Sequence, residues 1–169
     1  MQAGARSGRK EAAGPYPLAK LLACPPATSN LLNSSAQSIE FDGGETVFRQ
    51  SGLCKGLYVI VAGTFLRKAE RLEARLTLGP ARPGEIVELA AALGTGCHTY
   101  TLSAQSHGTV LLLPMEALQS AFESYPPLRM QLLEELAREV SRAYLACSFA
   151  RIVPARRRVS MGGEQAAQL

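Results

Sequence analysis

The stretch "SIEFDGGETVFRQSGLCKGLYVIVAGTFLRKAE", residues 38–70, decides the fold of this chain. Its short β-branched and aromatic runs are interrupted by "DGG" and "SGLCKG", whose glycines favour tight turns between strands. Similar runs follow at 73–79, 98–105 and 109–114, separated by turn signals such as "GPARPG" and "SHG". About six to eight short strands at this spacing predict a small antiparallel barrel or jelly roll.

Beyond residue 113 the apolar period becomes that of helices. The segment "PMEALQSAFESY", 114–125, begins with proline and places Leu118 and Phe122 four residues apart, on one face of a helix. The segment 128–150 is the longest periodic run in the chain. We therefore predict a mainly β domain with flanking helices, followed by a short helix and a long C-terminal helix.

The long helix carries two apolar stripes. One follows alternating spacings of three and four, typical of a coiled-coil seam, and consists of Met130, Leu133, Ala137, Val140, Tyr144 and Cys147. The other consists of Leu128, Leu132 and Leu136 and is free to face the β domain. Two stripes favour two partners, so we predict a homodimer through this helix; the alternative is one broad stripe in a monomer.

Composition and charge limit the function classes. A chain of 169 residues that is 47% hydrophobic can bury one sizeable core. The net charge of +4 comes from the ends, because 1–20 and 149–169 each carry four Lys or Arg against one acidic residue, which leaves 10 basic and 12 acidic residues between them. A central part with a net charge of −2 does not track phosphates, so we expect no direct DNA binding by this chain alone.

The same patterns divide the chain. We predict a flexible leader over 1–16, the β domain with short flanking helices over 17–125, the long helix over 126–150 and a basic flexible tail over 151–169. The stretch 17–23, "PLAKLLA", predicts a short helix that the prolines at 25 and 26 end. In the tail, "ARRRVS" is most simply a solvated segment, with a nucleic-acid contact or a kinase site at Ser160 as alternatives.

Cysteine spacing and hydropathy bear on location. The four cysteines, at 24, 54, 97 and 147, form no closely spaced pair and are typical of free thiols in a reducing compartment. No stretch approaches the roughly 20 apolar residues that a membrane helix needs. We expect a cytoplasmic protein without a membrane partner.

Two segments resemble the cyclic-nucleotide-binding domain of the Crp/Fnr family of bacterial transcription regulators. "FDGGETVFRQSG", 41–52, resembles the family's opening hairpin, and "GLYVIVAGTF", 56–65, its central strand pair. The matching positions are Gly44, Glu45, Phe48, Gly52, Gly56, Tyr58 and Gly63. The resemblance covers roughly 38–148 and implies the same jelly roll, with a dimerising helix after it.

In that family the loop between the middle strands is a phosphate-binding cassette, roughly Gly-Asp/Glu-x-x-Gly-Glu-Leu-Ala and then Pro-Arg-x-Ala-Thr. The corresponding stretch here is "GEIVELAAALGTGCHTYTLSA", 84–104. Its matches to the family pattern are Gly84, Glu85, Ala91, Thr101 and Ala104. The candidate ligand-binding residues are Gly84, Glu85, Glu88, Leu89, Cys97, His98, Thr99 and Thr101.

The ligand-binding positions depart from the family pattern. Aligned without gaps, Glu88 replaces the second glycine, Leu89 the glutamate that takes the ribose hydroxyl, and His98 the arginine that holds the cyclic phosphate. A one-residue deletion returns Glu88 to the ribose position and leaves His98 unchanged. A neutral histidine lacks the charge and the paired donors of arginine, so we predict weak or absent binding of cyclic AMP and cyclic GMP and expect no other cofactor.

These observations favour a stand-alone, non-enzymatic regulatory domain that binds an unidentified small-molecule effector or a partner protein. One alternative is the effector-binding part of a Crp/Fnr-type DNA-binding regulator, since only about 20 residues follow the long helix, too few for a helix-turn-helix domain. Another is a metal-dependent jelly-roll enzyme that uses His98, His107 and Glu88, although solvated loop histidines and a solvated glutamate are the simpler expectation. A haem on Cys97 and His98 is a further alternative.

Overall fold

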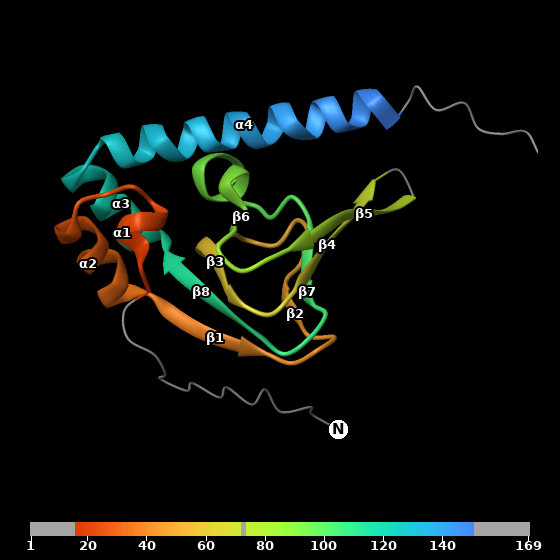
Figure 1. The fold of residues 1–169 in the computed structure, drawn as a ribbon, viewed down its shortest axis with the longest axis horizontal. Coiled ribbons are helices and arrows are strands. Elements are labelled where there is room, and N and C mark those ends of the chain that lie inside the picture. Colours follow the sequence, from red (N-terminus) through yellow and green to blue (C-terminus); the bar gives the residue numbers. More distant parts are fainter. Residues whose placement is uncertain (1–15, 72–73, 151–169) are drawn as a thin grey trace, which may run out of the picture. The chain divides into compact units, whose positions relative to one another are not determined.

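The computed structural model describes residues 16–71 and 74–150. The chain divides into two compact units, with the boundary between Leu136 and Ala137 inside the last helix. Every strand of the described residues lies in the first unit (Figure 1).

The strands form two four-stranded antiparallel sheets. The first sheet has the order β1 (Gln37–Phe41), β8 (Gly108–Pro114), β3 (Gly56–Ala62) and β6 (Ile86–Val87). The second has the order β2 (Thr46–Phe48), β7 (Thr101–Ala104), β4 (Phe65–Arg71) and β5 (Ala74–Ala81). The predicted jelly roll is confirmed, as two separate sheets and not as a closed barrel.

Strand β3 lies in the middle of the core and is buried on both faces. Leu57 and Val59 belong to an apolar cluster with the helices, whereas Tyr58 and Ile60 belong to a cluster between the two sheets. This explains why "LYVI" is a continuous apolar run in the sequence and does not alternate with polar residues.

A glycine allows the close crossing of the two sheets. Gly63, between β3 and β4, has φ +81°, and a Cβ there would lie 2.6 Å from the Cα of Gly108 and from the carbonyl oxygen of His107. A side chain at this position would therefore meet backbone atoms that have no room to move. The tight β3–β4 connection depends on this glycine.

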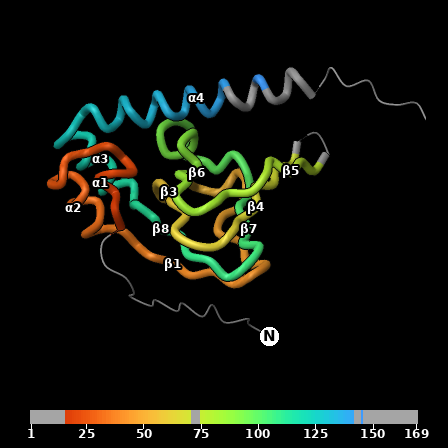
Figure 2. The backbone as a smooth tube through the Cα atoms, in the orientation of Figure 1, coloured from red at the N-terminus to blue at the C-terminus, as the bar shows by residue number. Residues whose placement is uncertain are grey.

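Three short helices gather at one end of the sheets: α1 (Leu18–Leu21), α2 (Pro26–Ser35) and α3 (Met115–Ser124). Figure 2 shows the chain bringing α2 beside α3, which is far from it in the sequence. The helix α2 is absent from the sequence-based prediction. The prediction treats the prolines at 25 and 26 as residues that end a helix. In the structure Pro26 occupies the first turn of α2, where proline is favoured.

The last helix, α4, runs from Pro127 to Ala150. In its first part Leu128 is fully buried and Leu132 is 4% exposed, so the stripe predicted to face the β domain does so. On the predicted seam, Met130 is 59% and Val140 60% exposed. The side chains of Tyr144 and Cys147 lie outside the described residues.

Candidate functional site

The candidate cassette begins at a turn between the sheets. Gly84 has φ +88° and donates its N–H to the carbonyl of Ile60, while the Ile60 N–H donates to the carbonyl of Glu85. After β6 the chain turns again at Glu88, a non-glycine residue with φ +67°. A π-helical turn, Ala91–Thr95, then leads to Gly96, whose N–H donates back to the carbonyl of Ala91.

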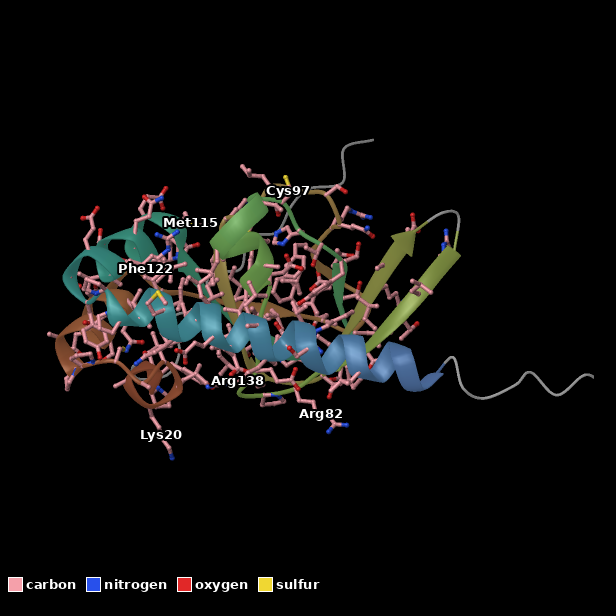
Figure 3. The ribbon with its side chains drawn as sticks, turned by 90° about the horizontal axis from the view of Figure 1, so that it is seen from above. Lys20, Arg82, Cys97, Met115, Phe122 and Arg138 are labelled. Atoms are coloured by element: carbon pink, nitrogen blue, oxygen red, sulfur yellow. The ribbon has the colours of Figure 1, made fainter. Side chains whose placement is uncertain are left out.

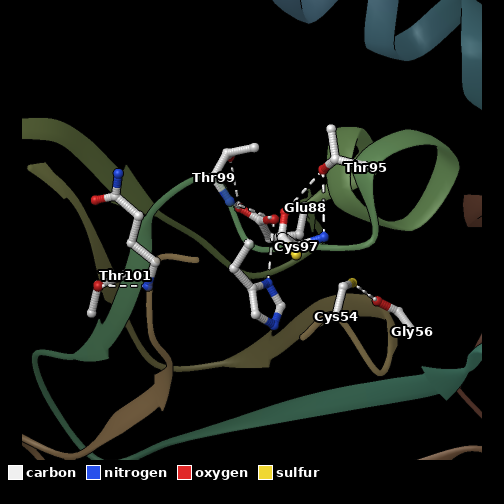
Figure 4. A network of polar contacts seen from close by, with 9 residues as sticks. Cys54, Gly56, Glu88, Thr95, Cys97, Thr99 and Thr101 are labelled. Atoms are coloured by element: carbon white, nitrogen blue, oxygen red, sulfur yellow. Dashed lines mark hydrogen bonds and ion pairs between the residues drawn. The ribbon is translucent and has the colours of Figure 1, made fainter. Parts of the chain in front are cut away.

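The carboxylate of Glu88 lies in a buried network of donors (Figure 4). The Thr99 N–H lies 3.2 Å from both carboxylate oxygens and the Thr99 hydroxyl donates to Oε1 over 2.9 Å. The Nδ1 of His98 lies 3.3 Å from Oε2. An ionised carboxylate only accepts, so this contact is a hydrogen bond when Nδ1 carries the proton. The side chains of Glu88 and His98 are 0% and 2% exposed.

Aromatic rings fix the orientation of His98. Its ring stacks on Phe48 with centroids 3.9 Å apart and planes 7° from parallel, and Tyr58 lies against it at 5.6 Å. Burial, and then the charges of Cys54 and Glu88, raise the pKa of Tyr58 to about 12, against a smaller lowering by a hydrogen bond with the backbone of Lys55. His98 therefore lies between a carboxylate and an aromatic wall and is held on both sides.

The other predicted cassette residues do not join this network. Leu89 is 2% exposed and belongs to the apolar core beside the helices. Thr101 accepts the N–H of Gln50, which ties the cassette to the loop after β2. Cys97 is exposed, and Figure 3 shows its sulfur directed outward.

The side-chain partner of Glu85 is a residue that the sequence does not single out. The Nη2 of Arg67, on β4, lies 2.6 Å from Oε2 of Glu85, and its Nη1 donates to the carbonyl of Pro80 over 2.7 Å. Burial alone would lower the pKa of Arg67, but the hydrogen bond with Glu85 and the interactions with Tyr100 outweigh it, so the pKa is raised. The period of two along β4 could have found this residue, because it puts Arg67 on the same face as the fully buried Phe65.

Two expectations about solvated side chains are wrong. Glu88 and His98 are buried, because each supplies the other with a hydrogen-bonding partner away from water. His107 is exposed as expected and contacts Asp42 at 3.0 Å. The three residues of the metal-enzyme alternative therefore do not converge, since His107 faces Asp42 and not the pair of Glu88 and His98.

The described residues are not arranged as ligands for a metal ion or a haem iron. Within residues 16–71 and 74–150, no three His, Cys, Asp or Glu side chains are grouped to hold a metal ion. Cys97 and His98 are neighbours in sequence, but one side chain is exposed and the other is buried. In the same part of the chain, no helix combines the length and hydropathy that crossing a bilayer requires.

The network also limits what the cassette can offer a cyclic nucleotide. Residues 84–104 contain no lysine or arginine, and the single buried carboxylate already accepts hydrogen bonds from Thr99 and His98. A ribose hydroxyl would compete with these donors for the carboxylate, and residues 84–104 supply no cation for a phosphate.

Comparison with known proteins agrees with this architecture. Residues 38–125, just over half of the chain, match the family model described as "Cyclic nucleotide-binding domain". No curated protein sequence matches the chain.

Several solved structures share the fold. The catabolite activator protein of Thermus thermophilus is 23% identical, with a TM-score of 0.66 over 75% of this chain and 60% of that one. The N-terminal domain of a transcriptional regulator from Streptomyces coelicolor is 21% identical, with a TM-score of 0.59 over 81% of this chain and 95% of that one. The sensor domain of the regulator DNR from Pseudomonas aeruginosa is 19% identical, with a TM-score of 0.61 over 71% and 91%. The chain thus spans 60% of the length of the Thermus protein.

Proposed function

This chain belongs to the cyclic nucleotide-binding domain family, and we propose that it is a regulatory sensor domain that binds cyclic AMP and cyclic GMP weakly or not at all. The family is a regulatory ligand-binding domain, and the similar structures include the sensor domain of a transcriptional regulator. The observation that carries the proposal is the buried contact between Glu88 and His98, with Thr99 completing the coordination of the carboxylate. The cassette binds its own side chains in place of a ligand.

The alignment with a one-residue deletion fits this proposal. It assigns Glu88 to the ribose-binding position, and Glu88 is the residue that faces His98, while Leu89 packs in the core. The two positions that hold a nucleotide in the family are then occupied by a glutamate and a histidine that contact each other. Removing a donor from this carboxylate to admit a ligand would cost about 1 to 3 kcal/mol.

We further propose that the domain transmits its state as a homodimer through α4. Met130 and Val140 are large apolar side chains with more than half of their surface exposed, and they lie on the stripe with coiled-coil spacing. A second copy of the helix would cover them. The effector in this proposal is a small molecule other than a cyclic mononucleotide, or a partner protein.

A second candidate is the effector-binding part of a larger DNA-binding regulator. It is supported by the Streptomyces structure, which is the N-terminal domain of a transcriptional regulator and is covered over 95% of its length. DNA binding by a longer product of the same gene, measured by fluorescence anisotropy, would favour this candidate over the stand-alone domain.

A thermal-shift screen tests the proposed ligand selectivity. A ligand that binds only the folded state raises the midpoint of unfolding by mass action. We expect no rise with cyclic AMP or cyclic GMP, and a rise with one member of a panel of nucleotides, cyclic dinucleotides and small organic acids. A rise with either cyclic mononucleotide that disappears in Glu88→Gln would contradict the proposal.

A further inference from the structure

A cationic group from β4, and not from the cassette itself, contacts the start of the cassette. Arg67 lies on the inner face of β4, where its register partners are Gly79 on β5 and Leu102 on β7. Its side chain is only 16% exposed. An arginine between apolar strand residues costs desolvation energy that a leucine at the same place would not, so its presence points to a role beyond packing.

The partners of Arg67 form a site for a carboxylate. The Glu85 carboxylate lies 2.6 Å from Nη2, the Pro80 carbonyl accepts from Nη1, and Tyr100 also forms a side-chain hydrogen bond with the guanidinium. Arginine presents its donors in a fork whose geometry matches carboxylates. Glu85 therefore serves as a built-in copy of the group that the site recognises.

Glu85 can leave this site more easily than Arg67 can. Its side chain is 41% exposed, so the carboxylate reaches water by rotation about its own bonds while its backbone stays bound to Ile60. A carboxylate that takes its place leaves the guanidinium paired, and the exchange avoids the cost of an uncompensated buried charge. Solvent reaches the ion pair from the Glu85 side.

The neighbourhood of the site favours an apolar body on the ligand. Tyr100 is only partly buried, and its ring packs beside the core with its centroid 5.7 Å from that of the buried Phe48. Aromatic faces of this kind pack against apolar and aromatic groups.

We propose that Arg67, with Tyr100 and the Pro80 carbonyl, is the binding site for the carboxylate of a small organic acid, which displaces Glu85. This inference rests on the proposed function and names the ligand class of the same sensor domain. Displacement of Glu85 would release the link between β4 and the start of the cassette, which couples ligand binding to the position of the loop after β6.

The test is a titration of the whole chain with sodium benzoate, succinate and acetate at constant ionic strength, followed by amide chemical shifts in NMR spectra. In Glu85→Gln the side chain that competes for Arg67 has lost its charge, so we expect this variant to bind benzoate about tenfold more tightly than the wild type does. Binding should shift the backbone amide signals of position 85, Ala81 and Tyr100. Arg67→Met should abolish these shifts, and Arg67→Lys, which keeps the charge without the fork, should weaken them. The matched controls are Glu70→Gln and Arg75→Met, because that ion pair is exposed, with side chains 73% and 90% accessible.

Three outcomes would overturn the inference. They are no shift with any of the acids in Glu85→Gln, equal binding by Arg67→Met, or binding of inorganic phosphate as tight as that of benzoate. None of these depends on cyclic nucleotides, so a failure here is distinct from a failure of the proposed function, which cyclic AMP binding by the wild type would reveal.

Discussion

One buried carboxylate explains how the cassette is arranged. Glu88 accepts hydrogen bonds from the N–H and the hydroxyl of Thr99, and the adjacent residue, His98, directs its ring to the same carboxylate. Consecutive residues reach one group because the side chain of one and the backbone of the next point to the same side. The stacking of His98 on Phe48 then holds the ring in place.

The two histidines provide a matched pair of substitutions. His98→Ala removes a donor from a buried carboxylate and a stacked ring, so we expect the free energy of unfolding to fall by about 2 to 4 kcal/mol. His107→Ala removes a side chain that is 65% exposed, and we expect a change within about 0.5 kcal/mol. Urea denaturation measures both, and equal losses from the two variants would contradict the buried network.

The raised pKa of Tyr58 predicts that the folded protein loses stability at alkaline pH. Its folded-state pKa of about 12 lies above the ordinary value of about 10, so the neutral hydroxyl is favoured in the fold. Below pH 10 both folded and unfolded states keep the proton; between pH 10 and 12 only the unfolded state releases it, and stability falls by about 3 kcal/mol.

Absorbance at 295 nm and urea denaturation across this range, compared with Tyr58→Phe, isolate the contribution of Tyr58. We expect the variant to lack the late ionisation and to lose less stability between pH 10 and 12. Ionisation of Tyr58 near pH 10 would show that the ring is accessible to solvent.

The sequence predicts which residues form this site, but it does not predict that their side chains are buried. Glu88, His98 and Thr99 are identified from the resemblance, but the sequence alone favours solvent for both Glu88 and His98. The period of two along β6 places Glu88 on the face opposite the buried Val87. The positive φ of Glu88 breaks that period and turns its side chain inward, and no local pattern reports such a backbone conformation.

At the scale of elements, the strands are the best predicted part and the short helices the least. The turn glycines delimit β1 to β5 closely, because the steric demands of turns are local. The helix α2 is missed because a proline can either end one helix or begin the next. The local sequence does not distinguish these two roles, and at Pro26 the fold selects the second. Arg67 escapes notice because its partner, Glu85, comes from another element 18 residues away.

Alanine substitution of Gly63 tests the tight β3–β4 connection, with Gly94 as the control. Gly63→Ala combines a positive φ with contacts of 2.6 Å to backbone atoms, so we expect a loss of about 3 kcal/mol or failure to fold. Gly94→Ala, in the π-helical turn, meets no atom within 4 Å and should leave stability unchanged or slightly raised. Thermal unfolding of both variants measures this, and a tolerated Gly63→Ala would mean that the sheets cross with more room than described.

At the scale of the whole molecule, the proposed dimer would pass the state of the cassette to a second copy of the chain through α4. The inward stripe of α4 is confirmed by the burial of Leu128 and Leu132, whereas pairing through the exposed stripe stays a prediction. A sequence pattern identifies an apolar stripe but does not show whether a second copy of the chain or solvent covers it. In a single chain the same side chains are exposed in both cases.

Charge placed on the exposed stripe tests the dimer. Met130→Glu combined with Val140→Glu puts like charges on a symmetric seam, and we expect the dimer to dissociate to monomers in sedimentation equilibrium. Arg138→Glu introduces the same side chain at an exposed position of α4 that does not flank the seam in the heptad, and it should leave the mass unchanged. A wild-type chain that is already monomeric, or a doubly substituted chain that remains dimeric, would contradict pairing through this stripe.

The central claim is that the cassette is occupied by its own glutamate and histidine and does not hold a cyclic nucleotide. Isothermal titration calorimetry of cyclic AMP and cyclic GMP into the wild-type chain tests it most directly. The proposed function predicts no binding heat at concentrations where a family cassette with its arginine would saturate. Low-micromolar binding that is lost in Glu88→Gln would contradict the claim, because it would mean that the ligand displaces His98 and takes the carboxylate for itself.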